Sequence, residues 1–244
     1  MRAPLGGSAL DAVLDPVLSV VFPARCPSCA RALERPLRGP LCEACWARVP
    51  SAPALRCRCG KRIPAGARCG RCRRGLEPLT AGLSLGPYEG PLKAALHELK
   101  YRGRRRVARR LALELVRAPG ARTWFEGDGV LVPVPLHPRR ERERGFNQAG
   151  ALAAALAAAL GLDHEQRALV RRVDTPSQTG LSAQQRRRNV ATAFAVRRRA
   201  RIAGRSVVLV DDVTTTGATA RACARALLAA GATEVKLLAV ARVE

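Results

Sequence analysis

From residue 78 onward, short apolar runs alternate with longer segments of helical periodicity. The apolar runs predict strands, and they lie at Gly82–Leu85, Gly129–Leu136, Ala168–Arg172, Ser206–Val210 and Glu234–Ala241. The helical patterns lie between these strands, at Pro91–Lys100, Arg104–Val116, Phe146–Leu160 and Gly217–Ala230. Strands and helices that alternate in this way predict an α/β domain with a mainly parallel sheet flanked by helices.

The first 77 residues have a different composition. They are rich in Pro, Gly and Arg, are poor in long apolar runs and hold eight of the nine cysteines. A segment this short usually needs a metal or covalent cross-links in addition to apolar burial. We therefore expect two domains, a cysteine-rich module with a short N-terminal helix at residues 1–77 and an α/β domain at residues 78–244.

The eight N-terminal cysteines form four pairs with the patterns CPSC, CEAC, CRC and CGRC. They are Cys26, Cys29, Cys42, Cys45, Cys57, Cys59, Cys69 and Cys72. Two CxxC turns a dozen or more residues apart are typical of a structural zinc site, because four thiolates leave no open position for catalysis. A disulfide scaffold is the alternative, but it needs an oxidising compartment. We predict one zinc ion on the first four cysteines and a second on the last four, where the CxC spacing is less typical. Cys223, inside an apolar helix, is expected to be a core residue.

The chain is strongly basic. It has 43 Lys and Arg against 19 Asp and Glu, a formal net charge of +24, which favours anionic partners such as nucleic acid or phosphorylated metabolites. Only 3% of the residues are aromatic, which argues against base stacking as the main contact with nucleic acid. The apolar stretch at residues 9–22 is interrupted by two aspartates and a proline, so it predicts neither a membrane span nor a signal peptide. We expect a cytoplasmic protein.

The stretch VVLVDDVTTTGATA at residues 207–220 points to a ligand site. A parallel strand followed by a loop and a helix puts that loop at the carboxyl edge of the sheet, where α/β folds bind ligands. Asp211 and Asp212 lie at the mouth of the strand, and the following threonines and Gly217 offer hydroxyl and N–H groups to an anion. The pattern predicts a sugar diol held by the carboxylates, directly or through Mg²⁺, and a phosphate held by the loop. An acidic turn without a ligand is the alternative.

This stretch resembles the signature with which type I phosphoribosyltransferases bind phosphoribosyl pyrophosphate (PRPP). The segments VPVPLHPRRERERGFNQA and TPSQTGLSAQQRRRNVATAF, with LKYRG at Leu99–Gly103, are similar to the hallmark segments of the ComF family. That family joins an N-terminal double zinc ribbon to a phosphoribosyltransferase domain with a Rossmann-like fold, and it is implicated in natural competence. The resemblance covers nearly the whole chain. The CRC pair departs from it, because relatives usually carry CxxC there.

The resemblance implies roles for the matched positions. Asp211 and Asp212 would take the ribose hydroxyls. The 5′-phosphate would be held by Thr214, Thr215, Thr216, Gly217, Ala218 and Thr219. The turn after VPVPL would form the pyrophosphate loop with His137, Arg139 and Arg140. A flexible catalytic loop, with matched positions Gln178, Arg186 and Asn189, would close over the substrate. The implied reaction is substitution at the anomeric carbon, with Mg²⁺ and arginines stabilising the departing pyrophosphate. A plain loop position for His137 and a solvated basic run at residues 186–188 are the alternatives.

Two classes of function remain open. The first is an enzyme, a PRPP-dependent phosphoribosyltransferase whose acceptor the sequence does not name. The second is a binding module that handles single-stranded DNA during uptake and uses PRPP, if at all, as a regulator, with a competence helicase as a further partner implied by the resemblance. The basic helix puts arginines on several faces for phosphate contact, namely Arg104, Arg105, Arg106, Arg109 and Arg110. A transcriptional regulator is less expected, because no helix-turn-helix pattern is evident.

Overall fold

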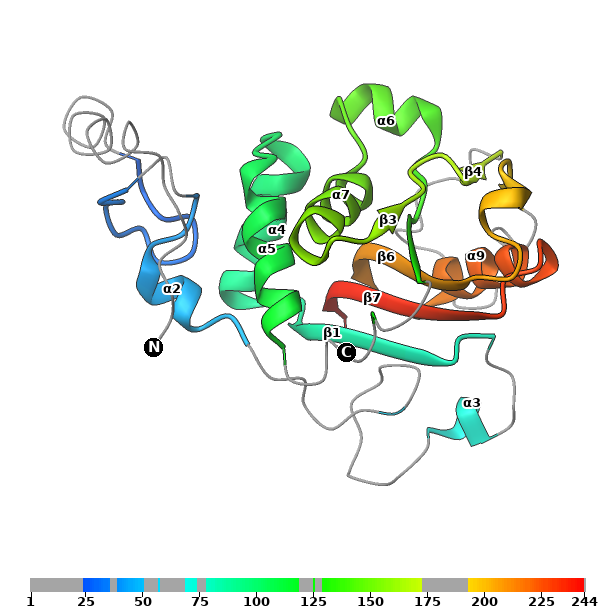
Figure 1. The fold of residues 1–244 in the computed structure, drawn as a ribbon. Helices are drawn as coiled ribbons and strands as arrows, with labels where there is room; N and C mark the ends of the chain where they lie inside the picture. Colours follow the sequence, from blue (N-terminus) through cyan, green and yellow to red (C-terminus); the bar gives the residue numbers. More distant parts are fainter. Residues whose placement is uncertain are drawn as a thin grey trace.

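The computed structural model describes residues 24–35, 39–50, 57, 69–73, 78–118, 125, 129–172 and 193–243. Its centre is a parallel sheet of five strands in the order β1-β7-β6-β2-β3 (Figure 1). The strands are β1 Ala81–Pro87, β2 Val130–Pro133, β3 Asp163–His164, β6 Ser206–Thr214 and β7 Glu234–Arg242. Strand β6 is therefore the middle strand. Its residues 207–210 pair with β2 on one side and β7 on the other, whereas its carboxyl end, from Asp211 to Thr214, pairs with β7.

Helices cover both faces of this sheet (Figure 1). On one face lie α4 Gly90–Tyr101, α5 Arg106–Arg117 and α7 Gln148–Leu160, and α9 Ala218–Ala229 lies on the other. Alternate residues of β6 serve the two layers, because successive strand residues point to opposite faces. Val208 and Val210 join the core under α4, α5 and α7, whereas Val207 and Leu209 join the core under α9.

The α/β fold with its parallel sheet and flanking helices is confirmed, and so is the order of its main elements. Some details differ from the sequence prediction. The strand expected at Ala168–Arg172 lies outside the main sheet, as β4 Leu169–Arg171 in an antiparallel pair with β5 Phe194–Val196. Strand β6 runs on to Thr214, because its pairing with β7 continues past the two aspartates to Arg242.

The segment after β2, expected as a turn, forms the helix α6 Pro138–Arg144. Pro138 occupies its first turn, and the side chain of His137 caps it by accepting the backbone N–H of Arg139 at 3.4 Å. Arg139 and Glu143 add an ion pair one turn apart, with 3.1 Å between Nε and Oε1. A further short helix, η3 Arg199–Arg201, follows β5.

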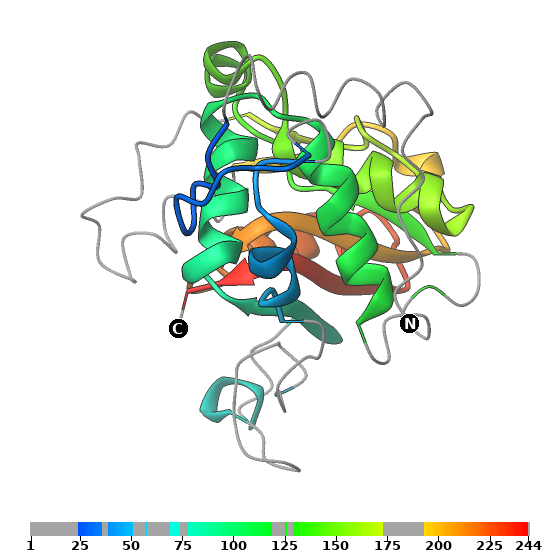
Figure 2. The same ribbon diagram turned by 90° about the vertical axis from the view of Figure 1, so that its left-hand side faces the viewer.

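The first part of the cysteine-rich segment, residues 24–50, packs against the α/β domain on the side of α4 and α5, where Figure 2 shows it in blue. It contains the short helix α2 Glu43–Ala47, whereas the short helix α3 Gly70–Arg73 lies apart from it in Figure 1. Cys26, Cys45 and Trp46 are buried in the same core as the leucines of α4 and α5. This segment therefore shares its apolar core with the larger domain. Within the described part of the chain, no helix is both long and apolar enough to cross a bilayer.

Candidate functional site

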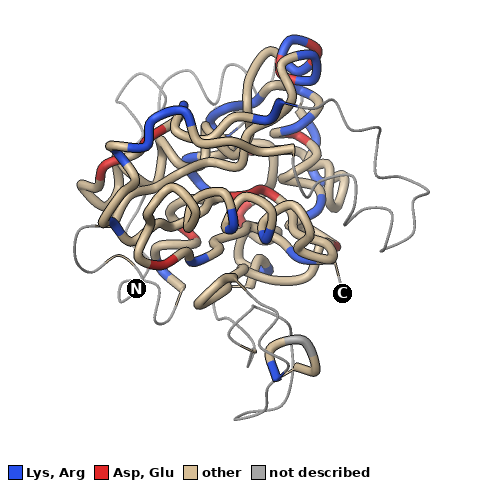
Figure 3. The backbone as a smooth tube through the Cα atoms, turned by 90° about the vertical axis from the view of Figure 1, so that its right-hand side faces the viewer, with Lys and Arg blue, Asp and Glu red and all other residues tan. Residues whose placement is uncertain are grey.

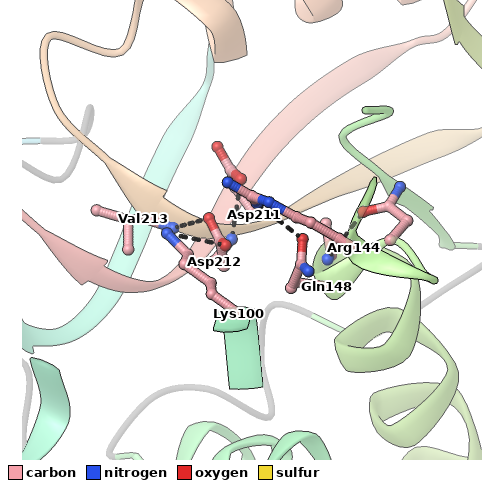
Figure 4. Close-up of polar contacts among 8 residues, drawn as sticks. Lys100, Arg144, Gln148, Asp211, Asp212 and Val213 are labelled. Atoms are coloured by element: carbon pink, nitrogen blue, oxygen red, sulfur yellow. Dashed lines mark hydrogen bonds and ion pairs between the residues drawn. The ribbon is translucent and has the colours of Figure 1, made fainter. Parts of the chain in front are cut away.

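Asp211 and Asp212 lie in the second half of β6, half-buried toward the carboxyl end of the central strand (Figure 4). Each carboxylate accepts a hydrogen bond from the next backbone amide. Oδ1 of Asp211 accepts the N–H of Asp212 at 2.9 Å, and Oδ1 of Asp212 accepts the N–H of Val213 at 2.6 Å. These bonds hold two acidic side chains within a strand, where side chains of this type are uncommon.

The electrostatics of this pair are unfavourable without a ligand. Burial, and then the neighbouring Asp212 carboxylate, raise the pKa of Asp211 well above its ordinary value. The partial compensation comes from Lys100 on α4, whose Nζ lies 3.1 Å from Oδ2 of Asp212. The same ammonium lies 5.8 Å from the centre of the Tyr88 ring. A sugar diol that donates hydrogen bonds, or a divalent cation, would therefore suit the two carboxylates.

The loop between β6 and α9 has the geometry of an anion cradle. Thr214 is buried at the end of the strand, and Gly217 takes a left-handed φ of 71° directly before α9 begins. Oγ1 of Thr216 accepts the backbone N–H of Ala218 at 3.4 Å. The backbone of this loop leads into a helix N-terminus, where N–H groups and the helix dipole favour an anion. The phosphate-binding residues expected from the sequence thus share one loop.

Arg221 was not expected from the sequence. It lies one turn into α9, is only 8% exposed, and donates from Nη2 to the carbonyl oxygen of Thr216 at 2.7 Å. A Cβ added at Gly217 would lie 3.0 Å from Nη1 of this guanidinium. Arg221 therefore fixes the loop and places positive charge beside it. No local pattern in the sequence marks it, because its role depends on its burial and on its bond to Thr216.

A second group of polar residues points toward the acidic pair from α6 and α7. Figure 4 shows Arg144 and Gln148 beside the acidic pair, with 3.1 Å between Nη1 of Arg144 and Oε1 of Gln148. Asn147 anchors this segment, because its Nδ2 donates to the carbonyl oxygen of Val134 at 3.0 Å, at the end of β2. Strand β2 is next to β6, so the segments that follow both strands open at the same edge of the sheet.

The remaining residues predicted for the phosphoribosyl site fall into two groups. His137 caps α6, and Arg139 and Arg140 lie in its first turn, at the end of the α6 segment away from Arg144. The predicted catalytic positions lie outside the described residues: Gln178, Arg186 and Asn189. The sequence contains no local pattern that marks Lys100, Arg144 or Gln148 as site residues, apart from their place in the segments similar to the family.

The arginines of the basic helix have unequal surroundings. Arg104 pairs with Glu98 at 3.3 Å, and Arg105 stacks on the Phe146 ring at 4.9 Å. Arg106 and Arg109 are exposed. Arg110 is largely buried, pairs with Glu114 at 3.2 Å and Glu43 at 3.5 Å, and covers the Trp46 ring at 5.1 Å. Its guanidinium therefore joins α5 to the cysteine-rich segment and faces away from bulk solvent.

The first four cysteines fit a zinc ion. The sulfur atoms of Cys26, Cys29, Cys42 and Cys45 all lie within 4.8 Å of one another, and the Cys29 and Cys42 sulfurs are 3.6 Å apart. Tetrahedral zinc with bonds of about 2.3 Å to sulfur requires sulfur atoms about 3.8 Å apart. Burial raises the pKa of the Cys45 thiol to about 12. Bound zinc supplies the positive charge that lets such a buried thiol ionise.

A second cluster joins Cys57, Cys69 and Cys72, whose sulfur atoms also lie within 4.8 Å of one another. The backbone N–H of Cys69 donates to the Cys57 sulfur at 3.4 Å. The fourth expected ligand, Cys59, lies outside the described residues. Three converging sulfurs fit the expected second structural zinc site. Cys223 is buried in the core under α9, as expected.

The fold and the site define a protein that joins a zinc ribbon to a phosphoribosyltransferase-type domain. The family model of the phosphoribosyl transferase domain matches residues 142–243, and that of the double zinc ribbon domain matches residues 17–73. The DNA utilization protein YhgH of Salmonella typhi is 35% identical over 208 residues, which are 83% of this chain and 90% of the relative. Competence protein F of Haemophilus influenzae is 31% identical over 226 residues, 91% of this chain and 98% of the relative. The chain belongs to the ComF family.

A more distant relative has the same kind of name. The competence protein ComFC of Bacillus subtilis is 29% identical over 144 residues, 59% of this chain and 56% of that protein. The match of the double zinc ribbon model includes the CRC pair. The CxC spacing is therefore a variation within a recognisable ribbon.

Proposed function

We propose that the chain binds PRPP with Mg²⁺ at the carboxyl end of β6 and transfers its phosphoribosyl group to an acceptor nucleophile. One observation carries this proposal: Asp211 and Asp212 directly precede a threonine–glycine loop that opens α9. The carboxylates accept hydrogen bonds from the ribose hydroxyls. The loop N–H groups, with Arg221 beside them, bind the 5′-phosphate. Ligand hydroxyls or Mg²⁺ also stabilise the charged form of Asp211, whose pKa is raised by burial and then by the Asp212 carboxylate.

In this mechanism the chain positions the sugar and stabilises the departing charge. The bond from C1 to the pyrophosphate oxygen breaks as the acceptor bonds to C1, and pyrophosphate leaves with the electron pair. Lys100 and Arg144 bring positive charge to the side of the site that pyrophosphate leaves, and Arg139 and Arg140 add charge on α6. Mg²⁺ bound with PRPP supplies further charge neutralisation. A role for Gln178, Arg186 and Asn189 in closing the site stays a prediction.

The experiment measures binding of Mg²⁺–PRPP by titration calorimetry, and release of pyrophosphate with a panel of bases and oligonucleotides as acceptors. Changing both Asp211→Asn and Asp212→Asn should abolish binding, because neutral amides lose the charge that holds the diol or the metal. Asp163→Asn is a matched control, since this aspartate is exposed on β3 and pairs with Arg205 at 3.1 Å. Absence of PRPP binding in the unaltered protein, or full binding by the double variant, would refute the proposal.

A second function is supported by the charge of the chain and by its relatives. The formal net charge is +24, and similar proteins are named for DNA utilization and competence. Figure 3 shows Lys and Arg spread over several elements, with many on α6. We infer that the chain also handles single-stranded DNA during uptake. Its affinity should fall steeply with salt and survive the Asp211→Asn, Asp212→Asn double change. Binding that is insensitive to salt would contradict this function.

The proposal keeps the expected organisation of the chain. The zinc-ribbon module ends at residue 77, the phosphoribosyltransferase domain begins at residue 78, and each of the two cysteine clusters holds a structural zinc ion. Thiolate–zinc sites of this kind fit a reducing compartment, which supports a cytoplasmic location. A competence helicase as a partner stays a prediction.

A further inference from the structure

The outer face of α4 presents a row of polar and aromatic side chains. Lys93, His97 and Tyr101 follow one another at intervals of four residues, so they share one face of the helix. All three are exposed. The opposite face carries Leu92, Leu96 and Leu99, which are buried in the core. None of these three side chains is therefore part of the buried core of the domain.

Tyr101 is the most exposed large apolar side chain in the described part of the chain, at 63%. By contrast, Trp46, Phe125, Phe146 and Phe194 are all buried. The ring of Tyr101 lies 4.6 Å from that of His97, tilted by 45°, and the guanidinium of Arg144 lies 5.8 Å from its centre. The exposed faces of these two rings are in contact with water, at a cost in free energy. A ligand with a flat ring would remove that cost by stacking on them, beside the nearby cations.

These rings line a cavity between the first zinc turn and α4. Its volume is about 440 Å³, and its walls include Pro27 and Ser28 of the CPSC turn, with Lys93, His97 and Tyr101 of α4. A cavity of this size accepts one nucleotide. Residues of the zinc turn and of α4 thus line the same cavity.

The charges around the cavity are suited to a phosphate. Lys93 and Arg102 line it, and Arg102 pairs with the buried Glu98 at 3.4 Å while remaining 69% exposed. Arg104, beside them, shares the same glutamate at 3.3 Å. The carboxylate of Glu98 thus has three cations near it, Lys93, Arg102 and Arg104, which leaves the surface positively charged. A polyanion that also offers flat rings fits this surface better than an acidic peptide does.

We propose that the groove between the Cys26–Cys29 turn and α4 binds single-stranded DNA. One base stacks on the rings of His97 and Tyr101, and the adjoining phosphates lie beside Lys93 and Arg102. This inference rests on the DNA-handling part of the proposed function and names its surface. One stacking position is also compatible with a chain in which only 3% of the residues are aromatic. Duplex DNA keeps its bases stacked inside, so the groove selects single strands.

The test measures fluorescence anisotropy of a labelled oligothymidylate with the full zinc-loaded chain. Tyr101→Ala should weaken binding about tenfold, in the range found when one stacking aromatic is removed, and leave the salt dependence unchanged. Tyr101→Phe keeps the ring and should bind within about twofold of the unaltered protein. Lys93→Ala should lower the slope of log affinity against log salt by about 0.7. Arg201→Ala removes an exposed charge on η3, away from α4, and is the matched control.

A second oligomer with abasic sites separates stacking from charge. The unaltered protein and Tyr101→Ala should bind it equally, since it offers no base to the ring. Equal binding of oligothymidylate by these two proteins, or an equal loss on both oligomers, would overturn the proposal, as would a preference for duplex. Mg²⁺–PRPP binding is measured on the same samples. If the chain binds PRPP but no single-stranded DNA, the groove proposal fails while the phosphoribosyl function stands.

Discussion

Replacement of Lys100 tests whether a buried ion pair holds the two site aspartates in place. Lys100→Met keeps an unbranched side chain of similar length and removes the charge. Nζ of Lys100 lies 3.1 Å from Oδ2 of Asp212, and only 14% and 15% of the two side chains are exposed, so water screens the pair weakly. At an effective dielectric constant of about 20, such a pair attracts by about 5 kcal/mol. Because part of that energy offsets desolvation, we expect Lys100→Met to lower the free energy of unfolding by about 3–5 kcal/mol.

The assay is urea unfolding of the zinc-loaded protein in a double-mutant cycle with Asp212→Asn. Asp212→Asn should destabilise less than Lys100→Met, because it also removes the charge that raises the pKa of the neighbouring Asp211. The double variant should be more stable than the sum of the two single effects predicts, by about 2 kcal/mol. Strict additivity, or a Lys100→Met variant within about 0.5 kcal/mol of the unaltered protein, would refute the reasoning.

The pH dependence of the Lys100→Met defect separates charge from packing. The defect arises from carboxylates that have lost their cation, so it should shrink as acidification protonates them. If it came from poor packing of the methionine, it would stay constant with pH. The comparison is made by measuring unfolding of both proteins from neutral to acidic pH.

Three further outcomes are expected. Asp211→Asn should raise the melting temperature at neutral pH by a few degrees while it weakens PRPP binding. The pKa of Asp211 is higher in the folded than in the unfolded state, so the unaltered protein loses stability as the pH rises from the unfolded to the folded pKa. A gain in melting temperature that persists at low pH would contradict this. Gly217→Ala should weaken PRPP binding at least tenfold, because the left-handed φ strains an alanine and a methyl group 3.0 Å from Nη1 would displace the Arg221 guanidinium. Unchanged calorimetric affinity would contradict this. In a Trp124→Phe background, chelation of zinc should change the fluorescence emission of Trp46 and lower the melting temperature, since the first cysteine cluster shares a core with Trp46. Emission that does not change when the chelator is added would contradict this.

The fold could be predicted because its signals are local. The alternation of apolar runs with helical patterns, and the strand–loop–helix order around Asp211 and Gly217, depend on residues close in sequence. The extension of β6 to Thr214 could not be predicted in this way, because it depends on pairing with Arg242 of β7. Helix α6 was missed because its arginines and glutamates have no apolar face, and the cap by His137 and paired charges stabilise it instead.

The site could be predicted only in part, because some of its residues come together only in the tertiary structure. The acids and the threonine loop are contiguous, so one segment of sequence contains them. Lys100 pairs with Asp212 from α4, and Arg144 at the end of α6 bonds to Gln148 beside the acids in Figure 4; only the tertiary structure brings those elements together. Arg221 looked like an ordinary helix residue, although its burial and its bond to Thr216 make it part of the loop.

Lys100 and Tyr101 show how one helix end serves two surfaces. Consecutive helix residues point about 100° apart, so Lys100 turns inward to Asp212 while Tyr101 turns outward to the groove beside the zinc turn. Arg144 spans the two, because it contacts the Tyr101 ring at 5.8 Å and Gln148 at 3.1 Å. The acidic site and the groove therefore share a single rigid turn of α4. A ligand that shifts this turn from one site would change the affinity of the other site for its ligand. By linkage, each ligand would change the affinity for the other by the same factor.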